Sequence, residues 1–75
     1  MARNQPFEIA AEMVANVMTL QVGVGDTVAV GDEVVLLESM KMEIPVIAER
    51  AGVVTEVKVT SGDVVQEGDV LLVLS

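Results

Sequence analysis

The sequence predicts an all-β domain of about eight short strands, built from one pattern used twice. Three observations indicate this: the chain matches itself when shifted by 37 residues, glycine–aspartate turns recur at a fixed spacing, and no segment sustains a helical period. Seventy-five residues are enough for one domain. Strands this short bury their apolar faces most simply in a small β-sandwich or flattened barrel.

The internal repeat covers most of the chain. With the 37-residue shift, residues 5–38 align with residues 42–75, and ten of the 34 pairs are identical. The agreement is sharpest between GDTVAVGD at 25–32 and GDVVQEGD at 62–69, where two Gly-Asp dipeptides keep the same separation. Valine richness alone would rarely produce that arrangement. We interpret the two copies as similar half-domains related by a pseudo-twofold axis.

Each half contains about four predicted strands. Residues 17–22 and 54–59 interleave apolar and polar side chains, whereas residues 34–37 and 70–74 are continuous apolar runs typical of buried strands. The Gly-Asp pairs mark turns, because glycine adopts positive φ easily and aspartate can hydrogen-bond to its own backbone two residues on. Between the paired turns, short strands are predicted at 27–30 and 64–67.

Composition excludes several classes of function. The chain has no Cys and no His, so we predict no catalytic residue, no thiol chemistry and no metal site. Its formal net charge of −8 argues against binding nucleic acid. We expect residues 1–7 to form a flexible N-terminal tail and residues 8–75 to form the domain. With neither a signal peptide nor a membrane-spanning stretch in the sequence, we expect a cytoplasmic monomer without membrane contact.

The junction between the copies is the one interior segment without an internal match. It comprises Ser39, Met40 and Lys41, and twofold symmetry would place it at the pole opposite the termini. A hairpin with Met40 and Lys41 as its two central residues is consistent with the short separation of the flanking apolar runs. The flanking residues then face each other in pairs: Ser39 with Met42, Glu38 with Glu43, and Leu37 with Ile44.

This hairpin contains locally unfavourable choices. Its central residues need positive φ, which Met and Lys adopt only with strain of order 1 kcal/mol. Glu38 opposite Glu43 is a like-charge pair, unfavourable by roughly 0.2–1 kcal/mol. A lone exposed lysine is ordinarily just a solvated surface residue. The residues alone therefore lead to an acidic β-domain with an exposed Met-Lys-Met tip.

The stretch ESMKMEIPV at residues 38–46 resembles the attachment motif of biotinyl domains, in which the lysine of Met-Lys-Met carries biotin in amide linkage. Over residues 8–75 the duplicated pattern resembles the biotinyl/lipoyl attachment fold. The resemblance implies a barrel-sandwich hybrid of two four-stranded antiparallel sheets with pseudo-twofold symmetry and the attachment lysine on a hairpin tip. Ser39 stands where many biotinyl domains have Ala. Between Thr27 and Lys41 there is no insertion that could form the protruding thumb of some bacterial biotin carboxyl carrier proteins. The chain is thus similar to the short, stand-alone, biotin carboxyl carrier protein-like type.

The resemblance assigns biotin to Lys41, with Met40 and Met42 as the flanks recognised by biotin protein ligase and by the carboxylase. The chain would be a non-catalytic carrier in a biotin-dependent system such as an acyl-CoA carboxylase. It would accept a carboxyl group from biotin carboxylase and carry it to a carboxyltransferase. Acylation of Lys41 removes one positive charge and would change the formal net charge from −8 to −9, which favours a basic partner. Three neighbours are candidate docking residues: Glu38, Ser39 and Glu43.

Two alternatives stay open. The first is a lipoyl-bearing carrier, although such domains usually show Asp-Lys-Ala at the tip and Met42 departs from that pattern. The second is an unmodified barrel-sandwich adaptor domain. Lys58 lies within a strand pattern of the second copy and is not expected to be modified.

Overall fold

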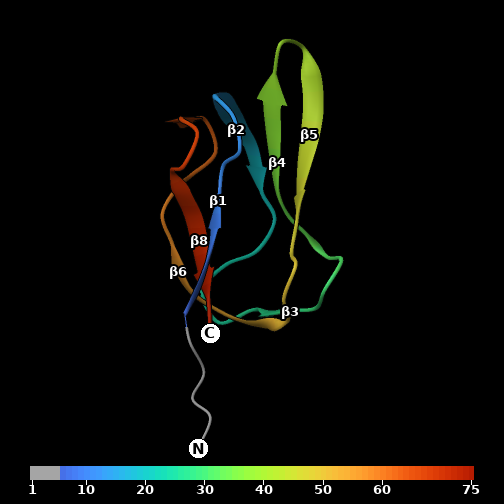
Figure 1. The fold of residues 1–75 in the computed structure, drawn as a ribbon, viewed down its shortest axis with the longest axis vertical. Coiled ribbons are helices and arrows are strands. Elements are labelled where there is room, and N and C mark those ends of the chain that lie inside the picture. Colours follow the sequence, from blue (N-terminus) through green and yellow to red (C-terminus); the bar gives the residue numbers. More distant parts are fainter. Residues whose placement is uncertain (1–5) are drawn as a thin grey trace, which may run out of the picture.

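The computed structural model describes residues 6–75, which form eight strands and no helix, hence no helix capable of crossing a membrane within that range (Figure 1). The strands are β1 (Phe7–Ala10), β2 (Ala15–Leu20), β3 (Thr27–Val28), β4 (Glu33–Ser39), β5 (Met42–Ile47), β6 (Gly52–Val57), β7 (Val64–Val65) and β8 (Val70–Leu74). They form two four-stranded antiparallel sheets. We call β1-β8-β6-β3 the terminal sheet and β5-β4-β2-β7 the hairpin sheet. The predicted fold class is confirmed.

The two copies of the repeat are interlaced. The first copy supplies β1–β4 and the second β5–β8, yet each sheet contains two strands of each copy. The register repeats as well: Val17 pairs with Leu37, its counterpart Val54 pairs with Leu74, and a register shift follows each pair. The pseudo-twofold relation therefore holds for pairing as well as for sequence, although neither copy forms a sheet of its own.

The core lies between the sheets and is built mainly on their central strands. On β4 and β8 the most deeply buried side chains are at most 1% exposed: Val34, Val35, Leu37, Leu71, Leu72 and Leu74. Both strands have neighbours on either side, so their apolar runs are covered along most of their length. The prediction that residues 34–37 and 70–74 form buried strands is confirmed.

The Gly-Asp turns have the expected glycine conformation but a different hydrogen bond. Four glycines have φ between 93° and 97°: Gly25, Gly31, Gly62 and Gly68. The predicted bond to the backbone two residues on was wrong, because each aspartate carboxylate instead accepts the N–H of the residue three positions earlier, as from Gly23 to Asp26 Oδ2 at 2.8 Å. The N–H of Asp26 also donates to the Gly23 carbonyl at 3.0 Å, so Asp26 and Gly23 are joined by two hydrogen bonds across the turn.

Some element bounds differ from the expectation. β3 and β7 have two residues each, shorter than 27–30 and 64–67, because the following turn begins at once, with Ala29 N–H donating to Asp32 Oδ2 at 2.9 Å. β1 begins at Phe7, one residue before the predicted start of the domain. There Phe7 pairs with Leu74, and the Arg50 guanidinium lies 4.6 Å from its ring centroid. Of the rest of the predicted tail, Pro6 belongs to no strand, and residues 1–5 lie outside the described residues.

Candidate functional site

The β4–β5 hairpin has the predicted register. Ser39 pairs with Met42, Glu38 with Glu43, and Leu37 with Ile44. The two residues of the turn, Met40 and Lys41, have φ of 55° and 66°. Positive φ at both central positions is what a type I′ turn requires, and this turn type matches the twist of the strands it joins. The tip is therefore tight despite its unusual residues.

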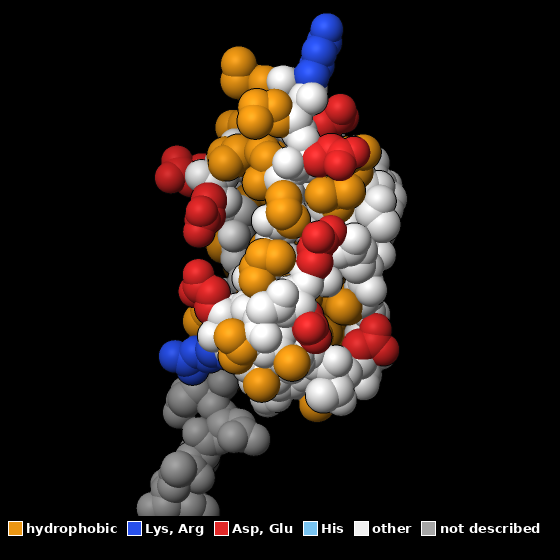
Figure 2. Space-filling view, turned by 90° about the vertical axis from the view of Figure 1, so that its right-hand side faces the viewer, with side chains coloured by type: hydrophobic (Ala, Val, Ile, Leu, Met, Phe, Trp, Pro, Cys, Tyr) orange, Lys and Arg blue, Asp and Glu red, His pale blue; other side chains and the backbone are white. Residues whose placement is uncertain are grey.

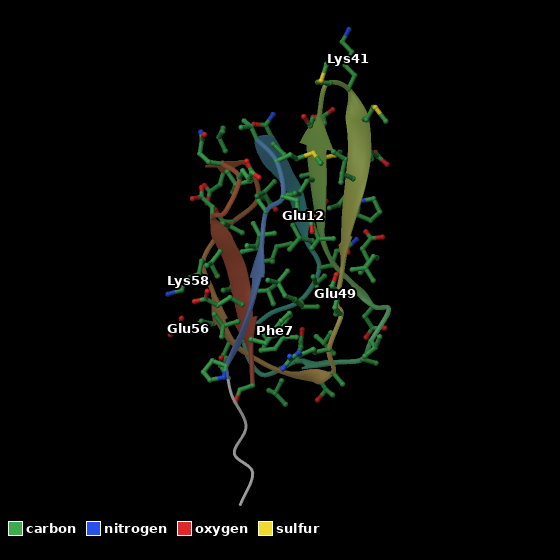
Figure 3. All side chains as sticks on the ribbon, in the orientation of Figure 1. Phe7, Glu12, Lys41, Glu49, Glu56 and Lys58 are labelled. Atoms are coloured by element: carbon green, nitrogen blue, oxygen red, sulfur yellow. The ribbon has the colours of Figure 1, made fainter. Side chains whose placement is uncertain are left out.

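The hairpin is fixed at its base and free at its tip. Val35 and Leu37 anchor β4 in the core, and β4 lies between β5 and β2. On the β2 side the ladder ends where Asn16 pairs with Glu38, so the last residues of the hairpin project beyond the neighbouring strand (Figure 1). Figure 3 shows Lys41 at one end of the molecule and Phe7, the first residue of β1, near the other end, as the repeat predicted. A stiff base thus presents one amine far from the rest of the domain.

The tip is open to solvent. Met40 is 91% and Met42 65% exposed, and Lys41 between them is exposed too. Within residues 6–75 the single ion pair joins Lys58 to Glu56, so no carboxylate of that range neutralises Lys41. An acyl group can be attached to the Lys41 amine without any rearrangement of its surroundings. The arrangement therefore fits a covalently attached group, while offering no adjacent base that could activate the amine.

Two carboxylates flank the base of the tip. Glu38 and Glu43 are directly opposed in the ladder, so their side chains lie on the same face of the sheet. Side chains alternate between the two faces along β4, and Glu38 follows the buried Leu37, so this is the outer face. The predicted like-charge pair is therefore present. The structure gathers all six predicted residues on this one hairpin: Glu38, Ser39, Met40, Lys41, Met42 and Glu43.

Lys58 is placed and held differently from Lys41. It follows the end of β6 at Val57 instead of lying within a strand, and its Nζ is 2.8 Å from Glu56 Oε1. The hydrogen bond to Glu56, together with the negative charge of that carboxylate, raises the pKa of Lys58. Figure 3 shows this pair on the side of the molecule away from the hairpin. Its amine is thus both remote from the tip and less readily deprotonated.

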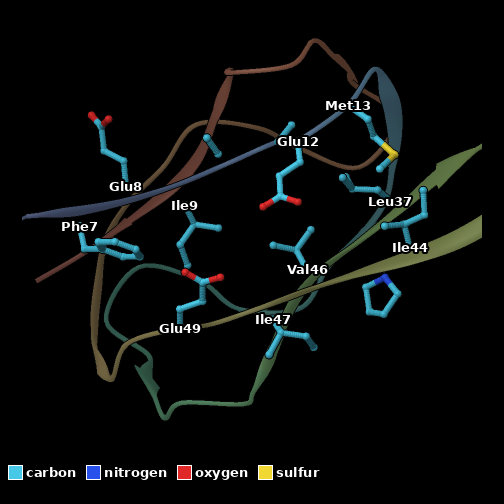
Figure 4. Close-up of a pocket in the computed structure, with 13 residues that line it drawn as sticks. Phe7, Glu8, Ile9, Glu12, Met13, Leu37, Ile44, Val46, Ile47 and Glu49 are labelled. Atoms are coloured by element: carbon cyan, nitrogen blue, oxygen red, sulfur yellow. The ribbon is translucent and has the colours of Figure 1, made fainter.

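A groove of about 410 Å³ opens between β1 and β5, the edge strands of the two sheets. Its apolar lining includes Ile9, Ile44 and Val46. Glu12 and Glu49, identical residues 37 positions apart, both point into it (Figure 4). Sequence reasoning missed this groove, because the Glu12/Glu49 identity is only one of the ten identical pairs of the repeat. The described residues contain no cluster of side chains suited to a metal ion.

Comparisons with known proteins agree with this geometry. A family model described as "Biotin-requiring enzyme" matches residues 8–74. The "Biotinylated protein TB7.3 homolog" of Mycobacterium leprae (strain TN) is 53% identical over 68 residues, which cover 91% of this chain and 96% of that protein. The "Biotin/lipoyl attachment protein" of Bacillus subtilis (strain 168) is 52% identical over 67 residues, covering 89% of this chain and 92% of that protein.

Among solved structures, a single-chain, multi-domain long-chain acyl-CoA carboxylase superimposes with a TM-score of 0.90 at 31% identity. The match covers 100% of this chain but only 8% of the carboxylase chain, so the similarity concerns one domain of that enzyme. The family model and the two relatives each cover most of the chain, and the solved structure has the same fold. This chain therefore belongs to the biotin/lipoyl attachment family.

Proposed function

We propose that this chain is a biotin carrier, with biotin joined through an amide bond to Nζ of Lys41, and that it serves a biotin-dependent carboxylase. The observation that carries the proposal is the exposed Lys41 at the tip of a two-residue hairpin, between Met40 and Met42. Membership in the attachment family, a relative named as biotinylated, and the matching domain of an acyl-CoA carboxylase all support it.

The residues of the chain present the group and do not transform it. For the amide to form, the Lys41 ammonium loses one proton to become a nucleophile, and the amine loses a second as it displaces the leaving group of an activated carboxyl. No base among the described residues is placed to take these protons, so a ligase supplies that function. Once attached to Lys41, biotin would supply a ureido nitrogen able to carry a carboxyl group from a biotin carboxylase to a carboxyltransferase. The flexible lysine stem on a stiff hairpin keeps that nitrogen at high effective concentration near each site.

The two methionines suit a tip that several enzymes must recognise. Met40 and Met42 are both largely exposed, so they contribute little to the stability of the free domain. Methionine is unbranched and polarizable, and it adapts its shape to different apolar surfaces. Met40 and Met42 can therefore make contacts with both a ligase and a carboxylase without a change in the hairpin.

The test is co-expression with a biotin protein ligase, read by intact mass and by streptavidin blotting. Wild-type protein should gain one biotinyl group, and Lys41→Arg should gain none while keeping the circular dichroism spectrum of the wild type. Lys58→Arg is the matched control and should be labelled like the wild type. Labelling that persists in Lys41→Arg would overturn the assignment.

A lipoyl carrier is the second candidate, because the name of the Bacillus subtilis relative covers both cofactors. Parallel co-expression with a lipoate ligase separates the two. A mass gain with lipoate ligase alone would replace biotin by lipoate in our proposal. No gain with either ligase would favour an unmodified adaptor domain.

The partner subunits can be identified with the same variants. Biotinylated wild-type protein, captured from its native cells on monomeric avidin, should bring down biotin carboxylase and carboxyltransferase subunits. Lys41→Arg, captured through an affinity tag in parallel with tagged wild type, shows which of these partners depend on the attached group.

A further inference from the structure

The outer faces of the two sheets differ, although both sheets come from the same repeat. The hairpin sheet exposes Met18, Ile47 and Val64 by 38%, 43% and 63%, and it also carries the half-buried Leu36 and the exposed Pro45. We call these five residues the hairpin-sheet patch. The outer face of an antiparallel sheet can be polar, so the fold itself does not require these exposed apolar side chains.

The repeat supplies an internal control for this patch. Each patch residue has a counterpart 37 positions away on the terminal sheet, and in each pair the patch residue is larger or more apolar. The pairs are Met18/Thr55, Leu36/Val73, Pro45/Glu8, Ile47/Ala10 and Val64/Thr27. Two outer-face pairs, Asn16/Val53 and Glu33/Val70, run the other way. Since Thr55, Glu8 and Thr27 occupy the equivalent positions in the same architecture, stability does not demand an apolar residue there.

The patch is continuous with the hairpin that carries Lys41. Pro45 pairs directly with Leu36, and Asn16 pairs with both Val64 and Glu38. The Cβ atoms of residues paired in this way lie about 4.5–5.5 Å apart. Figure 2, which faces the β4–β5 side of the molecule, shows hydrophobic side chains running down from the tip with carboxylates between them. Glu38 and Glu43 lie toward the tip, and Glu33 pairs with Ile47 at the other end.

We propose that the hairpin-sheet patch is the docking surface for the ligase that acylates Lys41, and that the ligase meets it with an apolar surface bordered by Arg or Lys. The inference rests on the proposed function. A ligase must select the chain before any group is attached, so only the protein surface can guide it, whereas later enzymes can bind the attached group itself. Docking on the hairpin sheet also points the partner at Lys41, while Lys58 is on the other side and paired with Glu56.

Charge disfavours a second copy of this chain as the occupant. The formal net charge is −8, and the patch is flanked by Glu33, Glu38 and Glu43. Packing two such faces together would bring these like charges close to one another, which is unfavourable. A partner with basic residues around an apolar centre complements the same surface.

The test replaces patch residues by their own counterparts from the terminal sheet. The variant Met18→Thr, Leu36→Val, Ile47→Ala changes no charge and leaves the hairpin tip intact. Thr55→Met with Thr27→Val is the matched control, because it moves apolar residues onto the terminal sheet. Initial rates of biotinylation by a biotin protein ligase, with biotin and MgATP in excess, give KM for the carrier chain and kcat. Circular dichroism and the thermal midpoint report folding.

We expect the patch variant to raise KM about tenfold, equivalent to about 1.4 kcal/mol, with kcat unchanged, and the control to match the wild type. If the patch variant folds poorly, Pro45→Glu at the exposed edge strand serves instead and should raise KM likewise. Efficient biotinylation of Lys41 with equal KM in wild type and variant would overturn this inference and leave the carrier function standing. Absence of biotinylation in the wild type would overturn the carrier function itself. Sedimentation showing a wild-type dimer that the patch variant abolishes would assign the surface to a second copy.

Discussion

Replacing the Met40–Lys41 turn by Asn-Gly should stabilise the domain while removing its attachment site. Both residues have positive φ, at 55° and 66°. For a residue with a side chain, that conformation is unfavourable by about 1–2 kcal/mol. Glycine at position 41 relieves this term fully, and asparagine, which tolerates the left-handed region, relieves part of it at position 40.

The net gain is smaller than the strain removed. Glycine loses about 0.4–1 kcal/mol more backbone entropy on folding than other residues. Replacing Met40 forfeits almost no burial, since 91% of its surface is already exposed. We therefore expect Met40→Asn with Lys41→Gly to raise the free energy of unfolding by about 1–2 kcal/mol. In a domain of this size, that corresponds to about 4–16 °C in Tm.

Equilibrium urea unfolding and thermal melts followed by circular dichroism measure this difference. Met40→Leu with Lys41→Arg is the control, because it keeps two strained residues in the turn and should stay within about 0.5 kcal/mol of the wild type. If the Asn-Gly variant and this control unfold at the same urea concentration, the turn stores no strain and the reasoning is wrong.

Three further predictions concern other positions. Gly68→Ala, at φ 93°, should destabilise the domain by about 1–3 kcal/mol in urea unfolding, whereas Gly23→Ala, which has open space and no positive φ, should be nearly neutral. Glu56→Gln should speed acetylation of Lys58 at about pH 9, because losing the carboxylate lowers the raised pKa and increases the neutral amine; peptide mass mapping would show an unchanged rate if the pairing were unimportant. Met42→Leu should still be biotinylated but turn over more slowly in a reconstituted carboxylase, and turnover equal to the wild type would contradict this.

The tip could be predicted in detail because the repeat confined the junction to three residues. With Glu38 ending one copy and Met42 beginning the other, a two-residue turn centred on Met40 and Lys41 gives the register that the structure shows. The strained conformation of Met40 and Lys41 followed from that register. The role of Lys41, by contrast, came from family resemblance, because an exposed lysine has no distinguishing chemistry of its own.

The neighbours of each strand could not be predicted from the pattern. Apolar periodicity shows which side chains of β4 and β8 face the core, but several strand orders would bury the same residues. The hairpin-sheet patch was missed for the same reason. The shifted sequence aligns Pro45 with Glu8 and Met18 with Thr55. Only the sheet order, however, shows that Pro45 and Met18 share a face.

The interlaced strands make the tip depend on the far end of the chain. β8 lies between β1 and β6, and its Leu71, Leu72 and Leu74 belong to the same core that anchors β4 through Leu37. Removing those last residues would leave β1 and β6 without the strand that pairs with both, and would leave a cavity in the core that supports the hairpin. A chain cut short by a premature stop would carry an intact Met-Lys-Met sequence and still fail to hold Lys41 in place.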